Sequence, residues 1–217
     1  MTGTPNGMLF VATDVAAQDE ADFNQWYDRE HVEERVRIDG FLSGTRYQAL
    51  QGGRKYLGLY KTTSLDSFTS AAYHAAFTRQ TPWSVACLDK MVNPMRRVCS
   101  LTTLSGIGCG SHLSILTLAV GADRPLVQRA RQLGEELASA AGFVCSSLLL
   151  PDALLSTPLP KETTENRRLL PMLLIESSSV QAGQRLADQA CAALNIAPDA
   201  ALQYALSWRL TAQELTS

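Results

Sequence analysis

The chain has 217 residues, of which 46% are hydrophobic and 18% are charged, and its formal net charge at pH 7 is -2. This composition is typical of a globular protein. Because the positive and negative charges nearly balance, the chain has no excess of positive charge to attract nucleic acid or an anionic membrane. The five cysteines are scattered without a CxxC pair, which argues against a disulfide framework and a zinc site. Because the sequence has neither a basic leader nor an apolar run of about 18 residues, we expect a cytoplasmic protein.

Hydrophobic periodicity and turn signals predict the order β-α-β-β-α-β in the first half of the chain. A strand is predicted over 8–13, and the helix that follows ends where Gly40 permits a left-handed backbone. The stretch QGGR at 51–54 is typical of a hairpin. The remaining predicted elements are strands over 41–50, 55–62 and 95–104 and a helix over 64–80, with Pro82 in the loop after that helix.

The same order starts again after the glycine-rich stretch SGIGCGS at 105–111. Strands are predicted over 112–120, 143–150, 169–177 and 202–210, and helices over 124–141 and 180–194. A polar, proline-containing loop over 151–168 is the one departure from a compact repeat. We therefore predict two halves, 1–105 and 106–217.

Together the two halves predict an α+β protein in which tandem ferredoxin-like repeats form an intramolecular α/β barrel. A four-stranded antiparallel sheet with both helices on one face leaves its other face bare. Packing the two sheets against each other would cover both bare faces within one chain. Further association into a homodimer stays open.

The first helix places a histidine and carboxylates among aromatic side chains, in the stretch FNQWYDREHVEERVRIDGF at 23–41. At about 100° per residue, one broad face carries Phe23, Trp26, Tyr27, Glu30, His31, Glu34 and Ile38. An unpaired buried polar group costs about 1–3 kcal/mol, so an ordinary core helix would carry aliphatic residues there. Either His31 is a satisfied structural histidine with the glutamates at a solvated margin, or this face lines a pocket.

With this order of elements, the first half resembles the EthD-like branch of the dimeric α/β-barrel superfamily. The similarity rests on FNQWYDREHVEERVRIDGFLSGTRYQAL, KYLGLYKT, SAAYHAAF and TPWS, and it covers about the first hundred residues. The superfamily includes cofactor-free isomerases, polyketide cyclases, lyases, decarboxylases and quinol-forming monooxygenases, so the fold alone does not name the reaction. The resemblance implies a pocket between the sheet and the first helix, lined by Tyr27 and His31.

In such a pocket His31 is the natural general acid/base, because imidazole titrates near pH 6.5. Tyr27 lies one helical turn before His31, and Glu30 can tune or orient the imidazole. Arg46 and Tyr47 alternate along their strand, so only one of them can face the pocket. The side chains expected to contact a substrate are Trp26, Glu34, Arg46, Tyr47, Tyr60 and Trp83.

The second half carries no comparable site. Its helix over 124–141 lacks the histidine and the aromatic pair, and its apolar stripe, which includes Leu133, is typical of core packing. The three histidines of the chain lack the spacing HExxH, and the sequence contains no GxGxxG, P-loop or GxSxG motif. We therefore expect one site per chain, with neither a metal nor an organic cofactor.

The predicted function is that of a cofactor-independent lyase or isomerase acting on a small aromatic or conjugated carbonyl or phenol. Proton removal by His31, assisted by Tyr27, would form an enolate- or phenolate-like intermediate. Two alternatives stay open: a cofactor-free monooxygenase of phenolic substrates, and a non-catalytic module that binds a small molecule. Oxygen consumption would distinguish the monooxygenase from the lyase or isomerase. A binding module would keep its biological effect in the variant His31→Ala.

Overall fold

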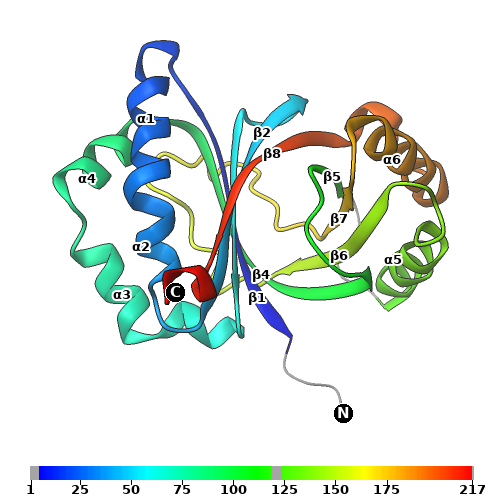
Figure 1. Cartoon of the computed structure of the whole chain (residues 1–217), viewed down its shortest axis with the longest axis horizontal. Helices are drawn as coiled ribbons and strands as arrows, with labels where there is room; N and C mark the ends of the chain where they lie inside the picture. The colour runs from blue at the N-terminus through cyan, green and yellow to red at the C-terminus, as the bar shows by residue number, and fades with distance from the viewer. Residues whose placement is uncertain (1–4, 119–123, 217) are drawn as a thin grey trace.

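The computed structural model describes residues 5–118 and 124–216. The strands in this part of the chain close into one antiparallel barrel, in which β4 returns to lie beside β1 (Figure 1). They are β1 (Asn6–Val15), β2 (Phe41–Gln51), β3 (Tyr56–Thr62), β4 (Met91–Gly106), β5 (His112–Thr117), β6 (Phe143–Pro151), β7 (Met172–Ser177) and β8 (Leu202–Thr211). β7 begins later than the predicted 169–177, and the end of the strand predicted over 112–120 lies outside the described residues.

Each half contributes one four-stranded sheet, and the two sheets share the same strand order. The first sheet runs β4-β1-β3-β2 and the second runs β8-β5-β7-β6. They join at two seams, where β2 pairs with β8 and β4 pairs with β6. The prediction of an α+β barrel built from tandem ferredoxin-like repeats is confirmed, while the boundary between 1–105 and 106–217 stays a prediction.

The helices cover the outside of the barrel, with those of the first half on one side and those of the second half on the other (Figure 1). The α-helices are α1 (Glu20–Trp26), α2 (Val32–Val36), α3 (Ala71–Thr78), α4 (Pro82–Asp89), α5 (Arg124–Leu137) and α6 (Val180–Leu194). The chain also forms the π-turn η2 (Tyr27–His31) and the 3-10 turns η1 (Ala17–Asp19), η3 (Leu65–Thr69), η4 (Pro198–Ala200) and η5 (Ala212–Leu215).

The region after β3 differs from its prediction. In place of one helix over 64–80, the chain forms η3 and α3, and then the additional helix α4. Pro82 begins α4 instead of marking a loop, because proline suits the first helical turn, where its missing N–H is not needed. Thr81 caps this helix by accepting a hydrogen bond from the backbone N–H of Ser84 at 2.9 Å.

Three apolar layers hold the fold together. The barrel interior is filled from both sheets, and a second layer packs the outer face of the second-half sheet against α5 and α6. The remaining layer lies between the first-half sheet and α1 to α4, and it contains the aromatic residues of the first helix. This last layer includes Trp26, Tyr27 and Tyr60 of the predicted site, whereas Tyr47 lies in the barrel interior.

Leu133 offers a test of the second-half layer, because its side chain on α5 is 2% exposed and packs among aliphatic neighbours. Replacing Leu133 with alanine is expected to lower the free energy of unfolding by about 2–5 kcal/mol, since it removes buried methyl groups and leaves a cavity. Urea denaturation measures this loss. The exposed Leu154 provides the control, and its replacement with alanine is expected to leave stability unchanged.

Candidate functional site

The first helix contains a π-turn where the site was predicted. η2 separates α1 from α2, and the backbone N–H of Val32 donates to the carbonyl oxygen of Tyr27, five residues earlier. A π-turn holds one residue more than an α-helical turn, and such turns are frequent at functional sites. Side chains after η2 are therefore rotated relative to those of a continuous α-helix.

His31 is buried on the inner side of this turn, with 7% of its surface exposed. Its ring centroid lies 4.2 Å from that of Trp26 and 5.0 Å from that of Tyr27, which it meets edge-on. Among the described residues, Nδ1 finds no hydrogen-bond partner. Burial, followed by the positive charges of Arg35 and Arg46, holds the pKa of His31 well below its usual 6.5, so the imidazole is neutral at pH 7.

Two tyrosine hydroxyls adjoin each other beside His31. Both lie over Gly58 on β3, where a Cβ atom would be 3.6 Å from Tyr27 Oη and 3.6 Å from Tyr60 Oη. The Tyr60 hydroxyl has no well-oriented hydrogen-bond partner within the described chain. Burial raises the pKa of both phenols, so both keep their protons and can donate a hydrogen bond to a ligand.

Tyr27, His31 and Tyr60 line a cavity of about 470 Å³ between the first-half sheet and its helices. This volume is in the range of small-molecule binding sites. Much of the remaining wall is apolar and is formed by Leu9, Val11, Phe77, Val85, Leu88, Met91 and Pro94. The arrangement favours the interpretation in which the inner face of the helix lines a pocket.

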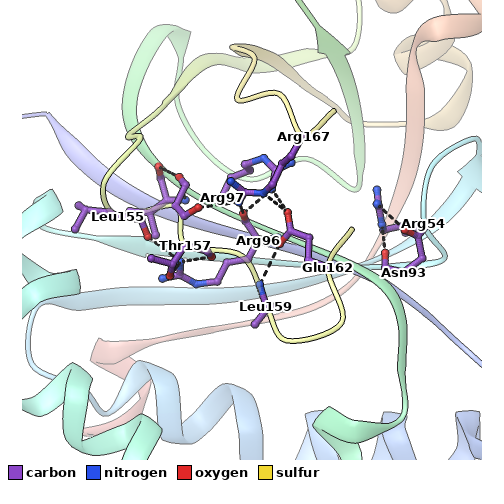
Figure 2. A network of polar contacts seen from close by, with 11 residues as sticks. Arg54, Asn93, Arg96, Arg97, Leu155, Thr157, Leu159, Glu162 and Arg167 are labelled. Atoms are coloured by element: carbon purple, nitrogen blue, oxygen red, sulfur yellow. Dashed lines mark hydrogen bonds and ion pairs between the residues drawn. The ribbon is translucent and has the colours of Figure 1, made fainter. Parts of the chain in front are cut away.

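The loop between β6 and β7 closes one side of this cavity through residues 159–161. It is fixed by a buried network around Glu162, which Figure 2 shows from close by. The Glu162 carboxylate accepts hydrogen bonds from the Arg97 side chain and from Arg167 Nε, the latter at 2.6 Å. The second half thus supplies a wall for the site of the first half.

Arg96 on β4 holds the same loop and also lines the cavity. Its guanidinium donates to the carbonyl oxygens of Leu155 at 2.8 Å and Thr157 at 3.1 Å, and to the Tyr73 hydroxyl at 3.1 Å. Its backbone N–H donates to the Glu162 carboxylate at 3.0 Å. The charged head of Arg96 is therefore engaged within the protein.

The two glutamates of the predicted face do not line the cavity. Glu30 accepts hydrogen bonds from Thr81 Oγ1 at 2.6 Å and Ser84 Oγ at 3.0 Å, which tie it to the start of α4. Glu34 lies half-buried outside the cavity, and burial followed by the charge of Glu30 raises its pKa. The extra residue of the π-turn explains this outcome, because it brings Arg35 rather than Glu34 to the cavity wall.

Neither predicted tryptophan is among the described residues that line the cavity. Trp26 is fully buried behind His31, and its Nε1 donates to Ser84 Oγ at 3.0 Å. Trp83 Nε1 donates to Asp22 Oδ1 at 3.0 Å and so links α4 to α1. The geometry gives Trp26 a role in holding the imidazole and gives Trp83 a role in packing.

Arg46 and Tyr47 point to opposite faces of β2, as their alternation predicts. Neither is among the described residues that line this cavity. The Arg46 guanidinium lies 4.2 Å above the Tyr27 ring and donates to Asp28 at 2.8 Å and Asn24 at 2.9 Å. Tyr47 lies inside the barrel, where it lines a second cavity of about 310 Å³. Other residues of that cavity are Lys61, Cys109, Cys145, Glu176 and Arg209.

Arg35 is the cavity residue that the sequence analysis missed. It is 4% exposed, lines the cavity and places its guanidinium carbon 4.8 Å from the centre of the Phe77 ring. The sequence does hold a signal, since Tyr27, His31 and Arg35 recur every four residues. A helical arginine is most often solvent-exposed, which hides that signal.

Comparison with solved structures shows which fold this is. An anthrone oxidase-like protein aligns over 97% of this chain and 94% of its own, with a TM-score of 0.66 and 12% identity. A Fusobacterium nucleatum protein provisionally named a monooxygenase aligns over 97% and 96%, with a TM-score of 0.58 and 8% identity. A chlorite dismutase mutant of Candidatus Nitrospira defluvii aligns over 95% and 93%, with a TM-score of 0.55 and 11% identity. The chain therefore has the dimeric α/β-barrel fold.

No protein-family model and no curated protein matches the sequence. The EthD-like branch and a homodimer stay predictions. Over residues 5–118 and 124–216, no helix is both long and apolar enough to cross a membrane. In the same part of the chain, no three His, Cys, Asp or Glu side chains gather in a way that would hold a metal ion.

Proposed function

We propose that the protein is a cofactor-independent enzyme that moves protons on a small aromatic or conjugated carbonyl or phenol, as a lyase or isomerase. One observation carries the proposal: a buried, neutral imidazole lines an apolar cavity, and its Nδ1 has no partner among the described residues. An enclosed polar atom without a partner costs about 1–3 kcal/mol in a protein. Such an arrangement is retained more readily where a ligand uses it.

His31 acts as the general base, because a neutral imidazole accepts a proton while an imidazolium cannot. The proton comes from a carbon next to a carbonyl group or from a phenol, and negative charge then develops on the ligand oxygen. Tyr27 and Tyr60 are protonated donors beside His31, so they can stabilise that oxygen in a largely apolar cavity. The imidazolium returns the proton at a new position in an isomerase, or to the leaving carbon in a lyase.

A thermal-shift screen tests the proposal with wild-type protein and a panel of aromatic and polyketide-like carbonyls and phenols. Each hit is then incubated with the protein, and its mass and the dissolved oxygen are followed. Conversion without oxygen uptake supports the lyase or isomerase, and conversion with stoichiometric oxygen uptake would move the assignment to a monooxygenase. Hits that bind and are never converted would leave a binding module.

Tyr27→Phe is expected to lower kcat/KM by about tenfold, since it removes one hydrogen bond while Tyr60 still donates to the same oxygen. Steady-state kinetics on a converted hit measures the effect. Tyr56→Phe is the matched control, because Tyr56 is buried on β3, the strand of Tyr60, but lies outside the cavity lining, and its hydroxyl accepts a hydrogen bond from Asn24 Nδ2 at 3.1 Å. Equal losses in both variants would show that the Tyr27 hydroxyl has no special role.

A further inference from the structure

Buried guanidinium groups in this protein are paired with one exception. The described chain buries Arg35, Arg46, Arg96 and Arg97. Arg46 pairs with Asp28, Arg97 pairs with Glu162, and Arg96 is bonded to the β6–β7 loop. The Arg35 side chain makes no hydrogen bond or ion pair with a described residue, and its Nη1 is enclosed without a partner.

No described carboxylate forms an ion pair or a hydrogen bond with the Arg35 side chain, although its charge lowers the pKa of the neighbouring Glu34 against the larger effect of burial. Phe77 covers one side of its guanidinium, and apolar residues form most of the cavity beside it. Asp89 also lines the cavity, but it pairs with Lys161 at 2.9 Å. The neighbouring Glu34 forms no ion pair with Arg35. Arg96, which also lines the cavity, has its guanidinium satisfied by hydrogen bonds to the β6–β7 loop and Tyr73. Among the described residues of the cavity wall, Arg35 is thus the arginine whose guanidinium has neither an ion pair nor a hydrogen bond.

A buried charge without a counter-ion is strongly unfavourable, and a ligand anion would remove this penalty. The planar guanidinium donates several hydrogen bonds in a fixed arrangement that suits carboxylates and related oxyanions. A neutral carbonyl oxygen would satisfy the hydrogen bonds but would leave the charge uncompensated. The apolar wall, in turn, suits a flat hydrocarbon frame.

We propose that this cavity binds a flat aromatic or conjugated ligand that carries an anionic oxygen group, and that Arg35 holds that group. The inference rests on the proposed function, whose cavity it shares, and it specifies the substrate class as an aromatic acid or an ionised phenol or enol. Arg35 follows His31 by four residues, so both contact one bound ligand from the same side of the cavity. Arg35 thereby determines specificity and fixes which end of the ligand meets His31.

Two fluorescent probes that share a frame test the inference. Anilinonaphthalene sulfonate carries an anionic group, and N-phenylnaphthylamine is the same frame without it. Wild-type protein is expected to bind the sulfonate more tightly than the neutral probe. Arg35→Met is expected to weaken sulfonate binding by about tenfold or more and to leave the neutral probe unchanged. Equal weakening of both probes, or no change in either, would overturn the inference.

Two further arginines serve as controls for general charge effects. Arg37 is exposed at the end of α2 and pairs with Glu33, and Arg209 lines the cavity inside the barrel. Arg37→Met and Arg209→Met are expected to keep the wild-type preference for the sulfonate. A loss of that preference in Arg209→Met but not in Arg35→Met would place the anion in the other cavity and refute the inference.

A competition experiment on wild-type protein tests the preference of the cavity for an anionic ligand, even if Arg35→Met does not fold. Naphthoate and naphthamide have the same ring frame and a similar shape, but only naphthoate carries a negative charge, and both compete with bound N-phenylnaphthylamine. Naphthoate is expected to displace the probe at least about tenfold more effectively, and equal displacement would contradict the inference. These are binding measurements, so their failure is distinct from failure of the proposed function, which is decided by turnover and by His31.

Discussion

His31→Ala is expected to lower kcat/KM on a converted substrate by about 10²–10⁴-fold, because it removes the general base. The fold should persist, since the imidazole makes no hydrogen bond from Nδ1 to the described chain that its loss would break. Steady-state kinetics measures the first expectation, and far-ultraviolet circular dichroism with a melting curve checks the second. His74→Ala is the control, because His74 lies exposed on α3 and should not affect turnover. Unimpaired turnover in His31→Ala would exclude the mechanism.

The pH dependence of the rate tests the role of His31 independently of the substitution. The pKa of His31 lies well below its usual 6.5, so the basic form is complete at neutral pH and the rate should be flat there. The rate should fall only as the pH drops through that lowered pKa. Stability should begin to decline at a higher pH than the rate, from about pH 6.5 down to the lowered pKa, because in that range the unfolded chain binds a proton that folded His31 does not. Activity is therefore normalised to the folded fraction.

Glu162→Gln is expected to lower the free energy of unfolding by about 3–5 kcal/mol, since it removes the carboxylate that two poorly exposed arginines share. Glutamine keeps the shape of the side chain, so the loss reports charge and not volume. Urea denaturation measures the change. Glu165→Gln in the same loop is the control, because Glu165 is exposed, and it should behave as wild type. Similar stability of both variants would show that the network contributes little.

At acidic pH, the free energies of unfolding of wild type and Glu162→Gln are expected to become equal. Burial alone would raise the pKa of Glu162, but hydrogen bonds from Arg167 and Arg97 outweigh it and hold the pKa below the usual 4.5. The stabilisation by the carboxylate is thus complete above about pH 4.5, the unfolded value. It is lost as the pH falls through the lower pKa of the folded state. A difference that persisted in strong acid would contradict this account.

The sequence predicted the barrel because the repeated order of elements leaves few ways to cover two bare sheet faces. It led us to expect a pocket beside Tyr27 and His31, because they stood out on an otherwise packing face, and both residues line the cavity. It did not predict the π-turn, since one extra residue shifts the pattern of a short helix by a single position, and a continuous α-helix also accounts for the aromatic residues before the turn. The assignments of Glu30 and Glu34 to the pocket depended on a continuous α-helix, and the turn directs both elsewhere.

Arg35 and the loop wall escaped the sequence analysis for different reasons. Arg35 can be identified as a cavity residue only from its burial and its lack of side-chain partners in the structure, because an arginine in a helix sequence is usually expected to be solvent-exposed. The loop contacts lie far from the first helix in the sequence, and Glu162 meets Arg97 across 65 positions of the chain. Contacts of that separation depend on the whole fold, so local patterns cannot reveal them.

The use of the β6–β7 loop as a wall has a consequence for how such a site can change. In an assembly of two identical subunits, a mutation that reshapes one wall reshapes its copy as well, and both pockets must tolerate it. Here the two sheets belong to one chain and carry different sequences, so the loop of one repeat is free to specialise for the pocket of the other. Because the two repeats differ in sequence, the pocket residues of the first repeat and the loop of the second can each change independently to fit different parts of one asymmetric ligand.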